Sequence, residues 1–136
     1  YPGAIPALDR ITAAGLPIAL VTNKEAAFAH RILVAHGLTG YFDVIVAGDT
    51  LSVRKPDPEM IEYALQALGA EADNAVLIGD SAIDVRTARA AGIAAWVMRH
   101  GYHLGELVGD DAPDRFIEHF DELAQTSELP ARVSIF

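Results

Sequence analysis

Apolar and polar positions follow two alternating periods along the chain. Short continuous apolar runs, which are typical of strands buried on both faces, occur at Ile18–Val21, Val44–Ala47, Val76–Ile78 and Ala95–Met98. Longer segments with apolar residues at helical spacing lie between them, at Ala4–Ala14, Lys24–His36, Pro58–Leu68 and Ala82–Ala91. A weaker pattern predicts a short strand at Phe116–Ile117 and a last helix at Glu118–Ala124.

Turn and capping residues mark the ends of these elements. The first predicted helices each stop at a glycine, namely Gly15, Gly37, Gly69 and Gly92. Asp57 is a candidate N-cap, and Pro58 suits the first position of a helix. Helices alternating with buried strands predict an α/β fold with a mainly parallel sheet and right-handed crossovers. We expect a Rossmann-like, three-layer α/β/α core.

The regular pattern weakens after Arg99. Residues His100–Asp114 are polar and contain glycine, so they predict a loop. We assign residues 1–125 to one core domain and residues 126–136 to a C-terminal tail. The end of the tail, Arg132–Phe136, is expected to pair as an edge strand or to be disordered.

Composition narrows the class of protein. The chain has 136 residues, of which 51% are hydrophobic and 21% charged, as in an ordinary globular domain. A net charge of −9 argues against nonspecific binding to nucleic acid or to an anionic membrane surface. The absence of cysteine excludes disulfides and zinc–thiolate sites. No apolar run reaches transmembrane length, and the first residues lack the pattern of a signal peptide, so we expect a cytoplasmic protein.

Polar residues follow the predicted strands where each of them ends. Thr22 and Asn23 follow the first strand, Lys55 lies in the loop after the second, and Asp80 ends the third, with Asp84 one helical turn further. In open parallel sheets, ligands bind beyond the carboxyl ends of the strands. A hydroxyl, an ammonium group and two carboxylates together suit a phosphate held with Mg²⁺.

Each of these residues also has a purely structural interpretation. Ser81 and Asp84 have the spacing of a capping box at the start of a helix. Thr22 and Asn23 could cap the helix that follows them. Lys55 could be an ordinary solvated loop lysine, although the proline after it stiffens the loop.

In sequence order, the segments Thr22-Asn23, Lys55-Pro56-Asp57-Pro58 and Gly79-Asp80-Ser81-x-x-Asp84 resemble three motifs of one family. They are similar to the second, third and fourth motifs of the haloacid dehalogenase superfamily, and most of all to its phosphoglycolate-phosphatase-like hydrolases. The likeness runs from Tyr1 to about Glu122, and it includes Gly101-Tyr102 after the last strand.

The resemblance implies a Mg²⁺-dependent phosphatase that acts on a small phosphorylated metabolite through an aspartyl-phosphate intermediate. On this chain, Thr22 would hydrogen-bond the phosphoryl oxygens with Asn23 beside it. Lys55 would neutralise the developing charge and restrain the nucleophile, and it is expected to be the only nearby cation besides the metal.

The same resemblance assigns the metal to the third strand tip. Asp80 would ligate Mg²⁺ directly, and Asp84 would support it directly or through water. Gly79 and Ser81 would have supporting roles around these carboxylates.

The family's first motif, a strand ending in Asp-x-Asp-Gly-Thr, does not occur in this sequence. In the family this motif supplies the nucleophile and the acid/base, and it precedes a cap domain. Its strand lies in the middle of the sheet, between those that end at Thr22 and Asp80. We therefore expect the first strand and the cap to be supplied as a separate segment or chain, and this chain alone to be inactive and unstable as a monomer.

Two other functions remain open. The chain could be a noncatalytic phosphate- and Mg²⁺-binding or regulatory module that has lost the nucleophile. A phosphoacceptor receiver domain is a third alternative, but it needs an acidic cluster near the first strand, which this sequence does not offer.

Overall fold

The computed structural model of the chain describes residues 2–102, 112–125 and 132–135. The helices are α1 (Ala4–Ala13), α2 (Ala26–Ala35), α3 (Glu59–Leu68), α4 (Ala82–Ala91) and α5 (Asp121–Gln125), with a short 3-10 helix η1 (Ala72–Asn74). The strands are β1 (Ile18–Val21), β2 (Val44–Val46), β3 (Ala75–Ser81), β4 (Ala94–Tyr102), β5 (Arg115–Ile117) and β6 (Arg132–Ile135). None of the helices in these ranges is long and apolar enough to cross a membrane.

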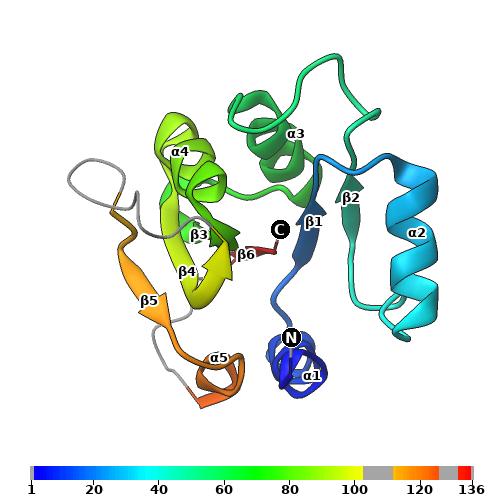
Figure 1. Cartoon of the computed structure of the whole chain (residues 1–136), viewed down its shortest axis with the longest axis vertical. Coiled ribbons are helices and arrows are strands. Elements are labelled where there is room, and N and C mark those ends of the chain that lie inside the picture. Colours follow the sequence, from blue (N-terminus) through cyan, green and yellow to red (C-terminus); the bar gives the residue numbers. More distant parts are fainter. Residues whose placement is uncertain (1, 103–111, 126–131, 136) are drawn as a thin grey trace.

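All described strands belong to one sheet in the order β2-β1-β6-β3-β4-β5. Every pair of neighbours runs parallel, so all strands end at the same edge of the sheet. Figure 1 shows α3 and α4 on one side of the sheet, and α1 and α5 together on the other. This arrangement confirms the predicted α/β fold with three layers.

Side chains at alternate strand positions belong to two apolar cores, one on each face of the sheet. Ala19 and Val21 of β1 pack with Leu77 of β3 in the core under α3 and α4. Ile18 of β1 and Ile78 of β3 pack in the core under α1 and α5. Because side chains of a strand alternate between faces, continuous apolar runs are needed to fill both cores.

The predicted helices are confirmed, with small shifts at one or both ends of most of them. Helix α2 begins at Ala26 rather than at Lys24, because the Ala26 N–H donates to Asp49 Oδ1 at 2.8 Å. Helix α3 begins at Glu59 with Pro58 as its N-cap, one residue later than predicted, and Asp57 accepts a bond from Glu59 N at 2.9 Å from just outside the helix. Gly69 ends α3 with φ of 65°, a left-handed conformation that glycine adopts without strain.

Two predictions about the second half of the chain are wrong. The segment that begins at His100 was expected to be a loop, but β4 continues to Tyr102. Its last residue pairs with Ser81 across a register shift in β3, so the ladder continues past an irregularity that an apolar pattern does not reveal. Residues 103–111 of the predicted loop lie outside the described residues.

The tail is neither an edge strand nor disordered in residues 132–135, where it forms β6 at the centre of the sheet (Figure 1). It pairs with β1 on one side and with β3 on the other. The expected gap between these two strands is therefore filled. The physical reason is that β1 and β3 each present an edge of backbone groups that must be hydrogen-bonded when buried. The local sequence indicates strand propensity, but it does not show that β1 and β3 need a hydrogen-bonded partner between them.

Candidate active site

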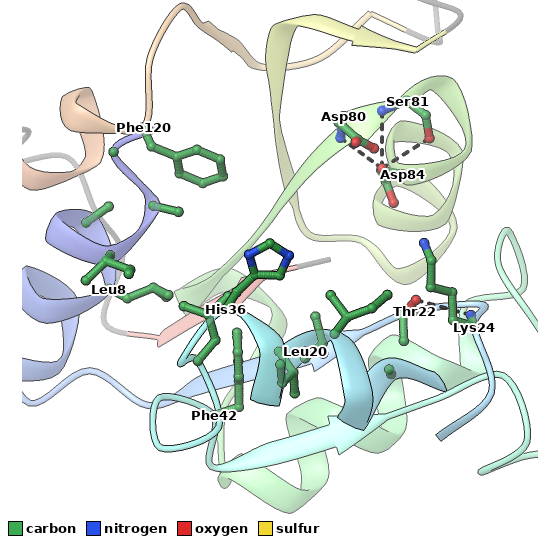
Figure 2. A pocket seen from close by; sticks show the side chains of 18 of the residues that line it. Leu8, Leu20, Thr22, Lys24, His36, Phe42, Asp80, Ser81, Asp84 and Phe120 are labelled. Carbon is green, nitrogen blue, oxygen red and sulfur yellow. Dashed lines mark hydrogen bonds between the residues drawn. The ribbon is translucent and has the colours of Figure 1, made fainter. Parts of the chain in front are cut away.

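Polar residues at or just beyond the carboxyl ends of β1, β2 and β3 line one cavity at this edge of the sheet. The cavity has a volume of about 770 Å³, and Thr22, Lys55 and Asp80 all line it. Figure 2 shows Thr22 on one wall, with Asp80, Ser81 and Asp84 on the wall opposite. The structure thus brings together the three strand tips on which the predicted phosphate site depends.

Several hydrogen bonds hold the side chain of Asp84 in this site. Its Oδ1 accepts a bond from Lys55 Nζ at 2.7 Å. Its Oδ2 accepts from Asp80 N at 3.0 Å, from Ser81 N at 3.2 Å and from Ser81 Oγ at 3.1 Å. Its side chain is 3% exposed. The capping interpretation of Ser81 and Asp84 is therefore correct, and the same carboxylate also holds Lys55.

Asn23 fixes the loop that carries Lys55. Its amide oxygen accepts a bond from Lys55 N at 2.8 Å, and its amide nitrogen donates to Lys55 O at 3.2 Å. The bond from Lys55 to Pro56 is cis. The side chain of Asn23 is thus committed to positioning Lys55. Sequence alone offered no sign of this pairing, because the two residues are 32 positions apart.

Thr22 makes a local turn rather than a helix cap. Its backbone N–H donates to Val46 O at 2.9 Å, and its Oγ1 accepts from Lys24 N at 3.2 Å. The helix that follows is capped by Asp49 instead. The Thr22 side chain is half-buried and faces the cavity (Figure 2).

Lys55 is not the only cation near the site, as the sequence had led us to expect. Lys24 also lines the cavity, is exposed, and extends from the Thr22 turn toward the wall that carries Asp84 (Figure 2). Two ammonium groups therefore border the polar end of the cavity. They balance the carboxylates of Asp80 and Asp84, so this end of the cavity does not share the excess negative charge of the whole chain.

Gly79 and Gly101 allow the polar residues of the site to pack closely. The sequence analysis gave Gly79 a general supporting role and gave Gly101 none. A Cβ on Gly79 would lie 2.3 Å from Asp84 Cβ. A Cβ on Gly101 would lie 2.0 Å from the backbone oxygen of Asp80. Neither glycine has a positive φ, so backbone conformation does not require glycine at these positions. Glycine is required because a side chain would have no space. Such a need for space is visible only in three dimensions.

Of the two carboxylates in the site, Asp80 and Asp84, only that of Asp80 suits a direct ligand of a hard cation. Among residues 2–102, 112–125 and 132–135, no group of three or more His, Cys, Asp or Glu side chains could hold a metal. Mg²⁺, however, is usually held by one or two carboxylates together with substrate phosphate and water. Asp80, half-buried at the cavity wall, fits that requirement. Both oxygens of Asp84 already accept bonds from protein donors.

Away from these polar groups the cavity becomes an apolar groove. Its walls include Leu8 of α1, Leu20 of β1, Phe42 and Phe120. Figure 2 shows Phe120 and Leu8 at the end remote from Asp84, with Leu20 between. The cavity thus combines a small polar end with a longer apolar extension on the α1 side of the sheet.

Comparison with known proteins identifies relatives of this chain in sequence and in fold. The sequence model of a family described as haloacid dehalogenase-like hydrolase matches residues 1–98. A phosphoglycolate phosphatase of Yersinia pestis is 36% identical over 131 residues, which are 96% of this chain and 56% of that protein. The chain therefore spans about half the length of the curated relatives it matches.

Solved structures share the fold over the same extent. A predicted phosphoglycolate phosphatase from Haemophilus somnus superposes with a TM-score of 0.85 and 28% identity, covering 92% of this chain and 56% of that one. A mutant of CbbY from Rhodobacter sphaeroides, in complex with xylulose-(1,5)-bisphosphate, gives a TM-score of 0.78 and 28% identity, covering 89% of this chain and 54% of that one.

Proposed function

The chain belongs to the haloacid dehalogenase-like hydrolase family, and from this premise we propose that it forms the phosphate- and metal-binding part of a phosphatase. The complete protein would hydrolyse a small phosphorylated metabolite. This chain would supply every element of the site except the nucleophile, the acid/base and the cap.

One observation carries the proposal: Lys55, held 2.7 Å from Asp84, lies in the same cavity as Thr22 and Asp80. A cation, a hydroxyl and a carboxylate from three strand tips surround one small volume. Phosphoryl transfer depends mainly on positioning and charge compensation, and little on covalent chemistry by the protein. This inventory therefore matches what such a site requires.

In this proposal each residue has a separate task. Thr22 donates its hydroxyl to a phosphoryl oxygen. Lys55 neutralises charge on the transferring group and on the nucleophile, and its ammonium is aimed by Asp84 from one side. Asn23 holds the backbone of Lys55, so it acts on phosphate through that lysine and through its place beside Thr22.

The cofactor that fits this site is Mg²⁺, with Asp80 as its direct carboxylate ligand. Asp84 supports the metal site from behind, through its bonds to the backbone N–H of Asp80 and to Ser81. Gly79 leaves the space for that contact. When bound, the metal would polarise the phosphoryl oxygens and offset their charge.

The nucleophile would be an aspartate from a segment outside this chain, forming an aspartyl-phosphate that water then hydrolyses. Relatives named phosphoglycolate phosphatase, and the complex of CbbY with a sugar bisphosphate, favour a small phosphorylated carbon compound as the substrate. Phosphoglycolate is the compound we would test first.

The decisive experiment replaces Asp80 in the full gene product that contains this chain. We expect Asp80→Asn to lower kcat for phosphoglycolate about 100-fold or more and to weaken the dependence on Mg²⁺ concentration, because a direct metal ligand is lost. Asp73→Asn, an exposed carboxylate in η1, is the matched control and should leave kinetics unchanged.

The same protein separates the proposal from its alternative. Binding of Mg²⁺ and phosphate measured by calorimetry, without turnover of any phosphomonoester, would identify a noncatalytic module. Unchanged kinetics in Asp80→Asn would contradict the assignment of the metal site.

A further inference from the structure

Lys24 is a cavity residue to which the proposed function gives no task. It is exposed and lines the polar end of the cavity. Figure 2 shows its side chain extending from the Thr22 turn toward the wall that carries Asp80 and Asp84. Within the described parts of the chain, no carboxylate forms an ion pair with its ammonium, whereas Lys55 is held by Asp84 at 2.7 Å. The ammonium of Lys24 is therefore open to a ligand.

The backbone of Lys24 is fixed on both sides. Its N–H donates to Thr22 Oγ1 at 3.2 Å, and its carbonyl oxygen accepts from Gly48 N at 2.7 Å. A Cβ on Gly48 would lie 2.1 Å from the carbonyl oxygen of Asn23 and 3.3 Å from that of Lys24, so only glycine allows this close contact. The segment after β2 thus clamps the turn after β1, and this one turn presents both Thr22 and Lys24 to the cavity.

The acidic residues near Lys24 leave its charge in the cavity uncancelled. Glu25 and Asp49 belong to the same region, but neither lines the cavity. Asp49 instead accepts the N–H of Ala26 at the start of α2, at 2.8 Å. Asp80 lies on the opposite wall and is the proposed ligand of Mg²⁺, so a bound metal would compensate that carboxylate. Lys24 would then be left to interact with the substrate.

The shape of the cavity limits which part of a substrate can reach Lys24. Beyond the polar end runs the apolar groove, whose walls include Leu20 and Phe42. A second charged group on a phosphorylated substrate would be poorly solvated in that groove, so it belongs at the polar end, beside Lys24. An ammonium carries a single positive charge on three N–H donors, which matches one carboxylate. A second phosphate, with a charge of about −1.5 to −2, would exceed what one lysine can compensate.

We propose that Lys24 is a specificity-determining residue of this site, and that it binds a carboxylate carried by the phosphorylated substrate. The inference rests on the proposed function, because it names the partner of a second group on the same substrate. The two lysines then have separate tasks. Lys55 acts on the phosphoryl group that is transferred, and Lys24 holds the part of the substrate that leaves as the alcohol. The favoured substrates are short phosphorylated carboxylic acids, of which phosphoglycolate is one.

The first test compares phosphoglycolate with ethyl phosphate, in which a methyl group replaces the carboxylate, in the full gene product that contains this chain. Lys24→Gln removes the charge and keeps a long polar side chain. It should lower the ratio of kcat/KM for phosphoglycolate to kcat/KM for ethyl phosphate about tenfold or more, mainly through KM, because the lost contact forms already in the bound substrate. Lys24→Arg keeps the charge and should keep most of the ratio.

A matched variant controls for net charge. Arg31→Gln removes one positive charge from an exposed position of α2 that does not line the cavity, and it should leave the ratio unchanged. Equal losses for both substrates in Lys24→Gln would mean that Lys24 binds the phosphate itself, and no loss would mean that it does not contact the substrate. Either result would overturn the inference. A larger loss with ethylene glycol bisphosphate than with phosphoglycolate would assign Lys24 to a second phosphate, and it would overturn the assignment to a carboxylate.

Turnover and binding separate this inference from the proposed function. Hydrolysis of both compounds, with an unchanged ratio in Lys24→Gln, would support the proposed function and overturn the role of Lys24. A protein that hydrolyses neither compound would refute the proposed function, and calorimetry in Mg²⁺ then tests Lys24 alone. The Kd of phosphoglycolate should rise about tenfold or more in Lys24→Gln, and that of ethyl phosphate much less. Phosphoglycolate that binds both proteins equally well, or neither of them, would overturn the inference.

Discussion

The buried pair of Lys55 and Asp84 is the contact in the site whose loss has the largest expected effect. The Lys55 side chain is 10% exposed and that of Asp84 is 3% exposed, so neither charge is well solvated alone. Removing one member of a buried pair leaves an uncompensated charge and costs about 3–5 kcal/mol.

We therefore expect Lys55→Met to lower the free energy of unfolding of this chain by about 3 kcal/mol. In the double variant Lys55→Met with Asp84→Asn, the loss in free energy of unfolding should be smaller than the sum of the two single losses by about 1–3 kcal/mol. The reason is that no unpaired buried charge remains when both partners are neutral. Urea unfolding of the four proteins measures this coupling. Lys24→Met, at an exposed lysine, is the control and should change stability by less than about 0.5 kcal/mol. Additive single losses would contradict the pair.

Gly79 offers a second test at the scale of one residue. An alanine Cβ there would lie 2.3 Å from Asp84 Cβ and 2.4 Å from its Cγ, so the carboxylate must move. Gly79→Ala should cost about 1–3 kcal/mol by overpacking and should weaken phosphate binding measured by calorimetry. Gly40→Ala, where a Cβ would meet nothing within 4 Å, should do neither. A Gly79→Ala protein with normal stability and phosphate affinity would exclude this close packing.

The site was predictable to the extent that it depends on strand tips. Thr22, Lys55 and Asp80 could be placed together because parallel strands end at one edge, and the cavity unites them as predicted. The clamp from Asn23 to the backbone of Lys55 was not predictable, since an amide 32 residues away has no local signature. The presence of Lys24 at the cavity was missed for a similar reason: its direction depends on the turn made by Thr22.

At the scale of elements, the join between β4 and β5 is held by a carboxylate that sequence analysis did not single out. Asp114 accepts bonds from Ala95 N at 2.7 Å and from Arg89 Nη1 at 2.8 Å. Its own N–H donates to Ala95 O at 2.8 Å. The hydrogen bond from Arg89 is the largest cause that holds the pKa of Asp114 below its ordinary value of 3.8.

A lowered pKa in the folded state makes this contact dependent on pH. Its contribution is fully present above the unfolded pKa, and it is lost as the pH falls through the lowered folded value. Asp114→Asn should thus destabilise by about 1 kcal/mol at pH 7, a modest effect because the group is partly exposed. The difference from the unmodified chain should vanish in acid. Urea unfolding across this pH range measures it, with Glu71→Gln, at an exposed position, as a control that should show no such trend. A constant difference at all pH values would contradict the role of the charge.

Helices and strands differ in how well the sequence predicted them. Helix α4 was predicted with its observed bounds, because Ser81 and Gly92 mark its two ends with local chemistry. The tail strand β6 was misplaced, because a strand's position in a sheet is set by its neighbours' edges and not by its own residues. Local signals thus fix where an element begins and ends, while long-range pairing fixes where it goes.

At the scale of the whole molecule, three connections join the two parts of the sheet on either side of β6, which are β2-β1 and β3-β4-β5. β6 bridges β1 and β3, α3 packs on both β1 and α4, and α1 packs against α5. The first connection gives β1 and β3 the hydrogen-bonded partner that the sequence analysis expected them to lack, and the instability of the isolated chain stays a prediction. Ile61 of α3 is fully buried in the core that this helix shares with β1 and α4.

Cooperation between the two cores can be measured through Ile61 and Trp96, which lie on opposite faces of the sheet. Ile61→Ala should lower the free energy of unfolding by about 2–5 kcal/mol, the cost of a cavity in a packed core. Since the connections above bind both cores into one unit, the Trp96 fluorescence and far-UV circular dichroism transitions should shift together to lower urea. Gln66→Ala, at an exposed position of the same helix, should leave both midpoints in place. A Trp96 transition that stays fixed while the circular dichroism transition moves would show that the two cores unfold separately.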